Sequence, residues 1–173
     1  MATATKKFIT FVAIALVAII AIVSSVYVIS VNGKGGETSS KAEISVAQIN
    51  KEIVEKMGYK GISELKSGDI SAHFDIPENS VTQASIYIAD SNVSAMEIAC
   101  FKLSGQQYEE AVRQSIAEHI SAKLKGFQES PKESEYIRNY ELDTADGYVF
   151  MAIGENADMA GKIFLAMFEE EKK

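Results

Sequence analysis

One carboxylate stands out among the residues of this chain that could do chemistry. Glu97 alternates with Ala95, Ala99 and Phe101 in a stretch that is otherwise apolar. A carboxylate in such a strand either lies at the rim of a sheet, paired with a Lys or Arg of the neighbouring strand, or is buried with a partner. A buried carboxylate has a perturbed pKa and marks a candidate site. The sequence favours the position at the rim.

The two histidines and the single cysteine do not predict a metal site. His73 lies in a predicted loop, His119 in a predicted helix far along the chain, and Cys100 in the most apolar stretch. A zinc site needs three or four closely spaced ligands, and a reactive thiol needs an electropositive, partly exposed setting. We therefore predict no metal ion and no cofactor. We expect surface or hydrogen-bonded histidines and a buried Cys100 that packs as a small hydrophobic side chain.

Two common local signatures of catalysis are missing from the chain. It contains no G-x-S-x-G elbow and no H-E-x-x-H. A carboxylate pair of Glu97 with Asp75 or Asp146 is the chemistry that remains, because glycosidases use two carboxyl groups roughly 5–10 Å apart. We predict no catalytic residue and no enzyme, with an envelope hydrolase that uses this pair as the alternative.

Tyrosines in the predicted strands are the candidate binding residues. Tyr87, Tyr140 and Tyr148 could supply aromatic anchors on one open face of a sheet. We also expect Glu97 to lie near Tyr148 on an adjacent central strand. These four residues form the predicted binding site.

Hydrophobic periodicity predicts the elements that must position these residues. Apolar residues at spacings of three and four predict helices over residues 45–57, 104–127 and 157–170. Apolar or alternating runs bounded by turn residues predict strands over residues 84–89, 95–103, 136–142 and 147–153. The order is one helix, then strand-strand-helix twice, with loops and short helical turns over residues 59–80. This order predicts an α+β domain in which helices pack on one face of an antiparallel sheet of about four strands.

The N-terminal part predicts a membrane anchor. Residues 8–31 contain no charged side chain and would span roughly 36 Å as a helix, enough to cross a bilayer. The run is too long for an ordinary signal peptide and lacks a good cleavage site, although cleavage stays open as the alternative. We predict a cytoplasmic segment over 1–7, a transmembrane signal anchor over 8–31, a flexible linker over 32–41 and an extracytoplasmic domain over 42–173.

The distribution of charged residues supports a cytoplasmic N-terminus and argues against some classes of partner. Lys6 and Lys7 directly precede the apolar run, whereas all 24 Asp and Glu follow it. Basic residues favour the cytoplasmic side of a membrane span. The acidic balance argues against a nucleic-acid partner, because binding to phosphates needs clustered Lys and Arg.

Two groups of residues resemble a known family. The first is residues 92–101 (NVSAMEIACF), and the second is a strand around residues 140–142, then residues 146–153 and an acidic helix start at residues 156–158. Together they resemble the bacterial family known as domain of unknown function 4358, over about residues 45–170. The resemblance implies an extracytoplasmic domain held by a membrane or lipid anchor, mostly in Gram-positive anaerobes. It brings no activity, cofactor or catalytic residue. Many relatives carry a lipid-bearing cysteine, which this chain lacks.

The sequence therefore predicts a membrane-anchored, non-enzymatic module at the bacterial cell envelope that binds an envelope protein or cell-wall material. A structural subunit of a membrane complex is a further alternative to this prediction.

Overall fold

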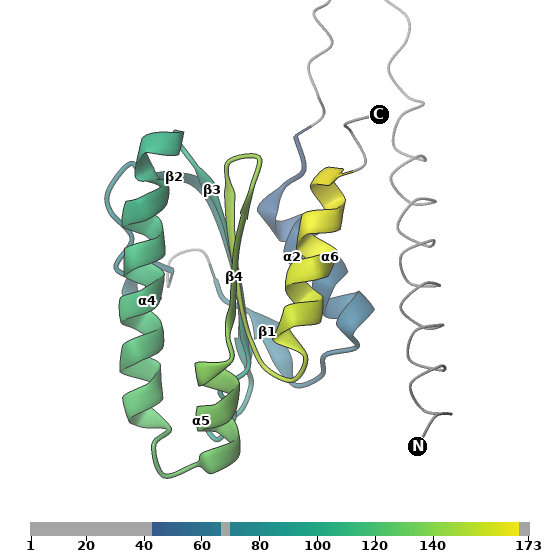
Figure 1. The fold of residues 1–173 in the computed structure, drawn as a ribbon, viewed down its shortest axis with the longest axis vertical. Coiled ribbons are helices and arrows are strands. Elements are labelled where there is room, and N and C mark those ends of the chain that lie inside the picture. Colours follow the sequence, from purple (N-terminus) through teal and green to yellow (C-terminus); the bar gives the residue numbers. More distant parts are fainter. Residues whose placement is uncertain (1–42, 67–69, 170–173) are drawn as a thin grey trace, which may run out of the picture. The chain divides into compact units, whose positions relative to one another are not determined.

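The computed structural model describes residues 43–66 and 70–169, and Figure 1 shows their arrangement. The helices are α2 (Val46–Met57), α3 (Ile70–His73), the 3-10 turn η2 (Gln106–Tyr108), α4 (Glu109–Gly126), α5 (Pro131–Arg138) and α6 (Ala157–Glu169). The strands are β1 (Ile62–Glu64), β2 (Val81–Ala89), β3 (Glu97–Leu103), β4 (Glu141–Ala145) and β5 (Tyr148–Ile153). These elements make an α+β domain.

The five strands form one antiparallel sheet in the order β1-β2-β3-β5-β4. The sequence predicted the four longer strands and missed β1, which spans three residues in the stretch predicted as loops and helical turns. β3 and β5 lie at the centre, and every residue of β5 is buried. Their central position agrees with their sequences, which are apolar on both faces.

Helices cover both faces of the sheet, so the prediction that they pack on one face is wrong. Figure 1 shows α4 and α5 on one side and α2 and α6 on the other. One core joins α2 and α6 to Ile98, Cys100 and Phe150, and the second joins α4 and α5 to Phe101 and Val149. Successive residues of a strand point to opposite faces, so β3 and β5 need a cover on each side. No bare sheet face is therefore left between these helices for the predicted binding site.

Local signals set several element ends as predicted. The Ser45 hydroxyl accepts a hydrogen bond from the Gln48 amide at 3.2 Å, and α2 ends at Gly58 with φ of 64°. Both features are ordinary helix signals, an N-cap side chain and a left-handed glycine. Asp146 and Gly147 have φ of 50° and 78°, and they make the tight turn between β4 and β5. This dipeptide is a preferred hairpin turn.

The strand predicted over residues 136–142 is wrong in its first half. Residues 131–138 form α5, which has Pro131 in its first turn, and β4 begins only at Glu141. Proline suits the first turn of a helix, because an amide N–H has no helical partner there. Tyr136 and Ile137 therefore belong to a helix rather than to an edge strand.

The predicted transmembrane run, residues 8–31, lies outside the described residues. Within residues 43–66 and 70–169, no helix has the length and apolar character needed to cross a membrane.

Candidate functional site

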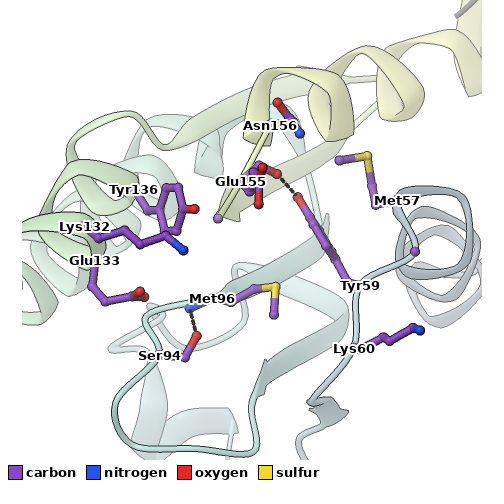
Figure 2. A pocket seen from close by; sticks show the side chains of 12 residues that line it. Met57, Tyr59, Lys60, Ser94, Met96, Lys132, Glu133, Tyr136, Glu155 and Asn156 are labelled. Carbon is purple, nitrogen blue, oxygen red and sulfur yellow. Dashed lines mark hydrogen bonds between the residues drawn. The ribbon is translucent and has the colours of Figure 1, made fainter. Parts of the chain in front are cut away.

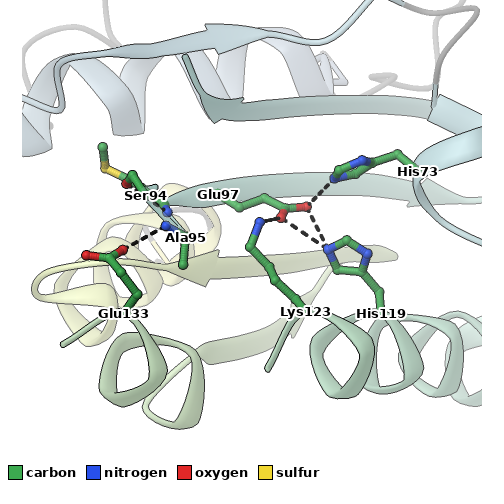
Figure 3. Close-up of polar contacts among 8 residues, drawn as sticks. His73, Ser94, Ala95, Glu97, His119, Lys123 and Glu133 are labelled. Carbon is green, nitrogen blue, oxygen red and sulfur yellow. Dashed lines mark hydrogen bonds and ion pairs between the residues drawn. The ribbon is translucent and has the colours of Figure 1, made fainter. Parts of the chain in front are cut away.

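Glu97 begins β3 and is fully buried beneath α4. Figure 3 shows its carboxylate facing His73 at the end of α3 and both His119 and Lys123 on α4. Burial contradicts the favoured prediction of a rim position, and the alternative of a carboxylate buried with partners is confirmed.

Three side chains from two helices converge on this carboxylate. The Nε2 atom of His73 lies 3.0 Å from Oε1, and the Nε2 atom of His119 lies 3.1 Å from both carboxylate oxygens. The ammonium group of Lys123 donates a hydrogen bond to Oε2. Glu97 is therefore held by an ion pair and by two imidazoles.

The sequence spacing explains half of this arrangement. His119 and Lys123 are four residues apart on α4, so they lie on the same face of the helix. This spacing, opposite an unusual carboxylate in an apolar strand, is the signal that sequence reasoning missed. His73 follows from the path of the chain before β2, and no local pattern could have found it.

Opposing effects act on the pKa of Glu97. Burial raises it, because it disfavours the charged form, but the hydrogen bonds from His119 and His73 and the charge of Lys123 outweigh burial. The net result is a pKa well below the usual range, so the carboxylate is ionised inside the domain.

The cluster also corrects the view that the histidines lie apart. One ligand atom each from His73, Glu97 and His119 can be chosen so that all three lie within 4.8 Å of one another. His119 also packs on Phe74, with ring centroids 4.1 Å apart. Cys100 is buried as predicted, and its side chain belongs to the core on the opposite face of the sheet.

A pocket with a volume of about 450 Å³ lies near the start of β3 and the end of β5. Figure 2 shows Tyr59, Met96, Lys132 and Tyr136 around it. It is lined by Met57, Gly58, Tyr59, Lys60, Ser94, Met96, Lys132, Glu133, Tyr136, Gly154, Glu155 and Asn156. None of these residues was predicted as a binding residue, because they come from four separate segments of the chain.

Hydrogen bonds and close packing hold one wall of the pocket. The Tyr59 hydroxyl donates a hydrogen bond to the Glu155 carbonyl at 2.8 Å. Gly154 has φ of 153°, and a Cβ atom there would lie 3.3 Å from the Met96 side chain. Burial, then the charges of Glu155 and Asp158, raise the pKa of Tyr59 to about 12. The phenol is therefore neutral over the physiological pH range.

The three predicted tyrosines do not share a surface. Tyr148 is 1% exposed, packs in the core with α2 and α6, and donates a hydrogen bond to the Ile44 carbonyl at 2.6 Å. Tyr87 is half-buried against that same core, whereas half-buried Tyr140 packs against the other one. They cannot act together as anchors on one open face.

Glu97 and Tyr148 are not neighbours, so that prediction is wrong. Glu97 pairs with Ile153 across the two central strands, whereas Tyr148 pairs with Lys102 at the other end. Glu97 faces α4, and Tyr148 lies in the core with α2 and α6.

The structure separates Asp146, one of the two predicted partners, from Glu97. Asp146 lies in the hairpin turn, where its carbonyl accepts a hydrogen bond from Lys102. Lys102 is five residues after Glu97 on β3, so at the rise of a strand Asp146 and Glu97 are roughly 16 Å apart. This exceeds the spacing that glycosidases use. Asp75 is exposed to solvent, whereas Glu97 is buried. Glu97 and Asp146 therefore cannot serve as the carboxylate pair of the alternative envelope hydrolase.

The comparisons with known proteins give one family. A family model described as Domain of unknown function (DUF4358) matches residues 47–154, more than half of the chain. No curated protein and no solved structure matches the chain. The match extends from α2 through β5 and so includes Glu97, both histidines and the hairpin of the central strands. This chain therefore belongs to the DUF4358 family of domains of unknown function.

Proposed function

We propose that the domain is a non-enzymatic binding module at the outer face of the bacterial cell membrane, and that it receives a short peptide segment of another envelope protein. The pocket between Tyr59 and Tyr136 is the observation that carries this proposal. It replaces the open sheet face expected from the sequence, because helices cover both faces.

The lining suits a peptide with an apolar side chain. Tyr59 and Tyr136 offer aromatic surface, and Met57 and Met96 offer flexible thioether side chains that adapt to different shapes. A volume of about 450 Å³ lies within the range of small-ligand pockets and matches a few residues of a peptide rather than a whole folded surface.

Charged side chains of both signs also line the pocket, beside these aromatic and thioether groups. Lys60 and Lys132 contribute positive charge, and Glu133 and Glu155 contribute negative charge. Glu133 already accepts a hydrogen bond from the Ala95 amide at 2.7 Å, which fixes its position beside the pocket. Mixed charge matches the alternating donors and acceptors of a peptide better than a uniformly charged polymer.

A photo-crosslinking amino acid placed at the rim tests this proposal in intact cells. We would introduce it at Lys60 and at Lys132 of the full chain, with exposed Ala117 on α4 as the matched control. The expected result is one envelope protein captured from both rim positions through the same peptide, and not from Ala117.

A pocket variant completes the test. Tyr136→Ala should lower the crosslinking yield roughly tenfold or more, because truncation of a central aromatic residue often costs about 2 kcal/mol of binding. Equal yields from the rim and from Ala117, or a yield that Tyr136→Ala leaves unchanged, would reject the pocket as the binding site.

A further inference from the structure

Both imidazoles of the chain meet at one buried carboxylate oxygen. The sequence contains two histidines, and the Nε2 atoms of His73 and His119 lie 3.0 and 3.1 Å from Oε1 of Glu97. Three separate elements, α3, β3 and α4, bring these groups together. The cluster uses none of the residues that line the pocket described above.

These separations are close to the edges of a metal coordination sphere. A tetrahedral zinc ion with bonds of roughly 2.0–2.1 Å places neighbouring ligand atoms roughly 3.3 Å apart. The two nitrogen-to-oxygen separations are a few tenths of an ångström shorter than this edge. One ring nitrogen of each imidazole lies within 4.8 Å of the other, so the two rings would approach one another by up to roughly 1.5 Å to bind one ion.

The donors are also of the right chemical class. Two imidazoles and one carboxylate form a set that zinc and other divalent transition metals favour, and they leave a coordination position for water. We propose that His73, Glu97 and His119 bind one divalent transition-metal ion of the zinc class through Nε2, Oε1 and Nε2. A metal ion binds only to an Nε2 atom that carries no proton, so any proton on either Nε2 atom is released when the ion binds.

Lys123 has two opposite effects on metal binding at this site. Its ammonium group is bonded to Oε2, which leaves Oε1 directed at the imidazoles. Its positive charge lies close to the ion position and so weakens cation binding. The side chains of His73 and His119 are 26% and 13% exposed, so the imidazoles are within reach of solvent.

Titration of the full chain with Zn²⁺ tests the proposal directly. The chain would be purified in detergent, stripped of metal and titrated calorimetrically. We expect one saturable site per chain. His119→Gln and His73→Gln should each weaken the affinity at least about tenfold, the scale of loss known for perturbed metal sites. The control Glu118→Gln, an exposed neighbour of His119 on α4, should bind as the parent chain does.

Two further readouts separate a metal site from a purely structural ion pair. Lys123→Gln removes the opposing charge but keeps a donor for Oε2, so Zn²⁺ should bind more tightly and raise the melting temperature more than in the parent chain. Co²⁺ should give ligand-field bands without a thiolate charge-transfer band, because Cys100 belongs to the other core. Binding that both histidine variants retain unchanged, or no saturable binding at all, would overturn the proposal.

Discussion

At the scale of single residues, Glu97 and Lys123 form an ion pair in the interior of the domain. Glu97 has no exposed side-chain surface, and the side chain of Lys123 is 14% exposed. Breaking such a pair from one side leaves a buried charge without compensation. The folded domain therefore needs both residues together, even if the pair itself adds little to the free energy of unfolding.

Glu97→Gln should lower the free energy of unfolding of the metal-stripped chain by about 3–5 kcal/mol. The double variant Glu97→Gln with Lys123→Met should lose less than the sum of the two single variants, since it leaves no unpaired charge. Urea unfolding measures all three. The exposed control Glu118→Gln should change stability by less than about 0.5 kcal/mol. Strict additivity of the two single variants would contradict the pairing.

The raised pKa of Tyr59 predicts that the domain loses stability at alkaline pH. Its pKa rises to about 12 in the folded domain, through burial and then the charges of Glu155, Asp158 and Tyr136. An unfolded tyrosine titrates near pH 10, so between about pH 10 and 12 the unfolded state binds fewer protons and stability falls as the pH rises. The contribution is complete below about pH 10.

Tyr59→Phe isolates this effect, because it removes the hydroxyl but keeps the ring. The stability difference between the parent chain and Tyr59→Phe should be constant up to about pH 9 and should move in favour of the variant by about pH 11.5. Urea unfolding at both values measures it. A difference that does not change with pH would contradict a raised pKa of the partly buried Tyr59 phenol.

At the scale of elements, α6 depends on a close approach to β4 at one glycine. A Cβ atom at Gly161 would meet the side chains of Asp143 and Glu141 on that strand. Oδ2 of Asp143 is buried, so it has little room to move away. A side chain at Gly161 would therefore push the helix and the strand apart.

Gly161→Ala should lower the free energy of unfolding by about 1–3 kcal/mol, the usual cost of overpacking. Gly126→Ala is the matched control, because nothing lies within 4 Å of a Cβ atom at that last residue of α4. It should raise stability by about 0.4–1 kcal/mol by reducing the freedom of the unfolded chain. Thermal unfolding of both variants measures the contrast, and a shift of the same sign in both would contradict the close packing.

Local signals explain which elements the sequence could predict. Ser45 and Gly58 bound α2, in agreement with the helix predicted over residues 45–57, and runs that are apolar on both faces indicated the central strands β3 and β5. The strand predicted over residues 136–142 is wrong in its first half, because Pro131 begins a helix that continues to Arg138. The short strand β1 depends on pairing with β2, which is distant in sequence and leaves no local pattern.

At the scale of the whole molecule, the sequence also held a clue to the two helical layers. β3 and β5 are apolar on both faces, which demands a cover on each side. The expected one-sided arrangement ignored this demand and so placed Tyr148 on an open face. The site around Glu97 could be predicted only in part, since the approach of His73 depends on the path of the chain between β1 and β2.

The proposed location at the membrane predicts a clear difference between two chains. The full chain should sediment with membranes and be released by detergent but not by high salt, because residues 8–31 are apolar throughout. A chain that begins at residue 42 should stay in the soluble fraction. Cell fractionation with immunodetection measures both, and a soluble full chain would contradict the anchor.

Methionine methyl NMR tests the central claim, that the pocket is where this domain binds its partner. The chain has six methionines; Met57 and Met96 line the pocket, whereas Met151 and Met167 are buried in the two separate cores. The full chain, labelled at its methionine methyl groups, would be titrated with peptides from digested cell-envelope proteins. Saturable shifts of Met57 and Met96, with Met151 and Met167 unmoved, are the predicted result. Shifts confined to other methionines, or no shift at all, would contradict the account.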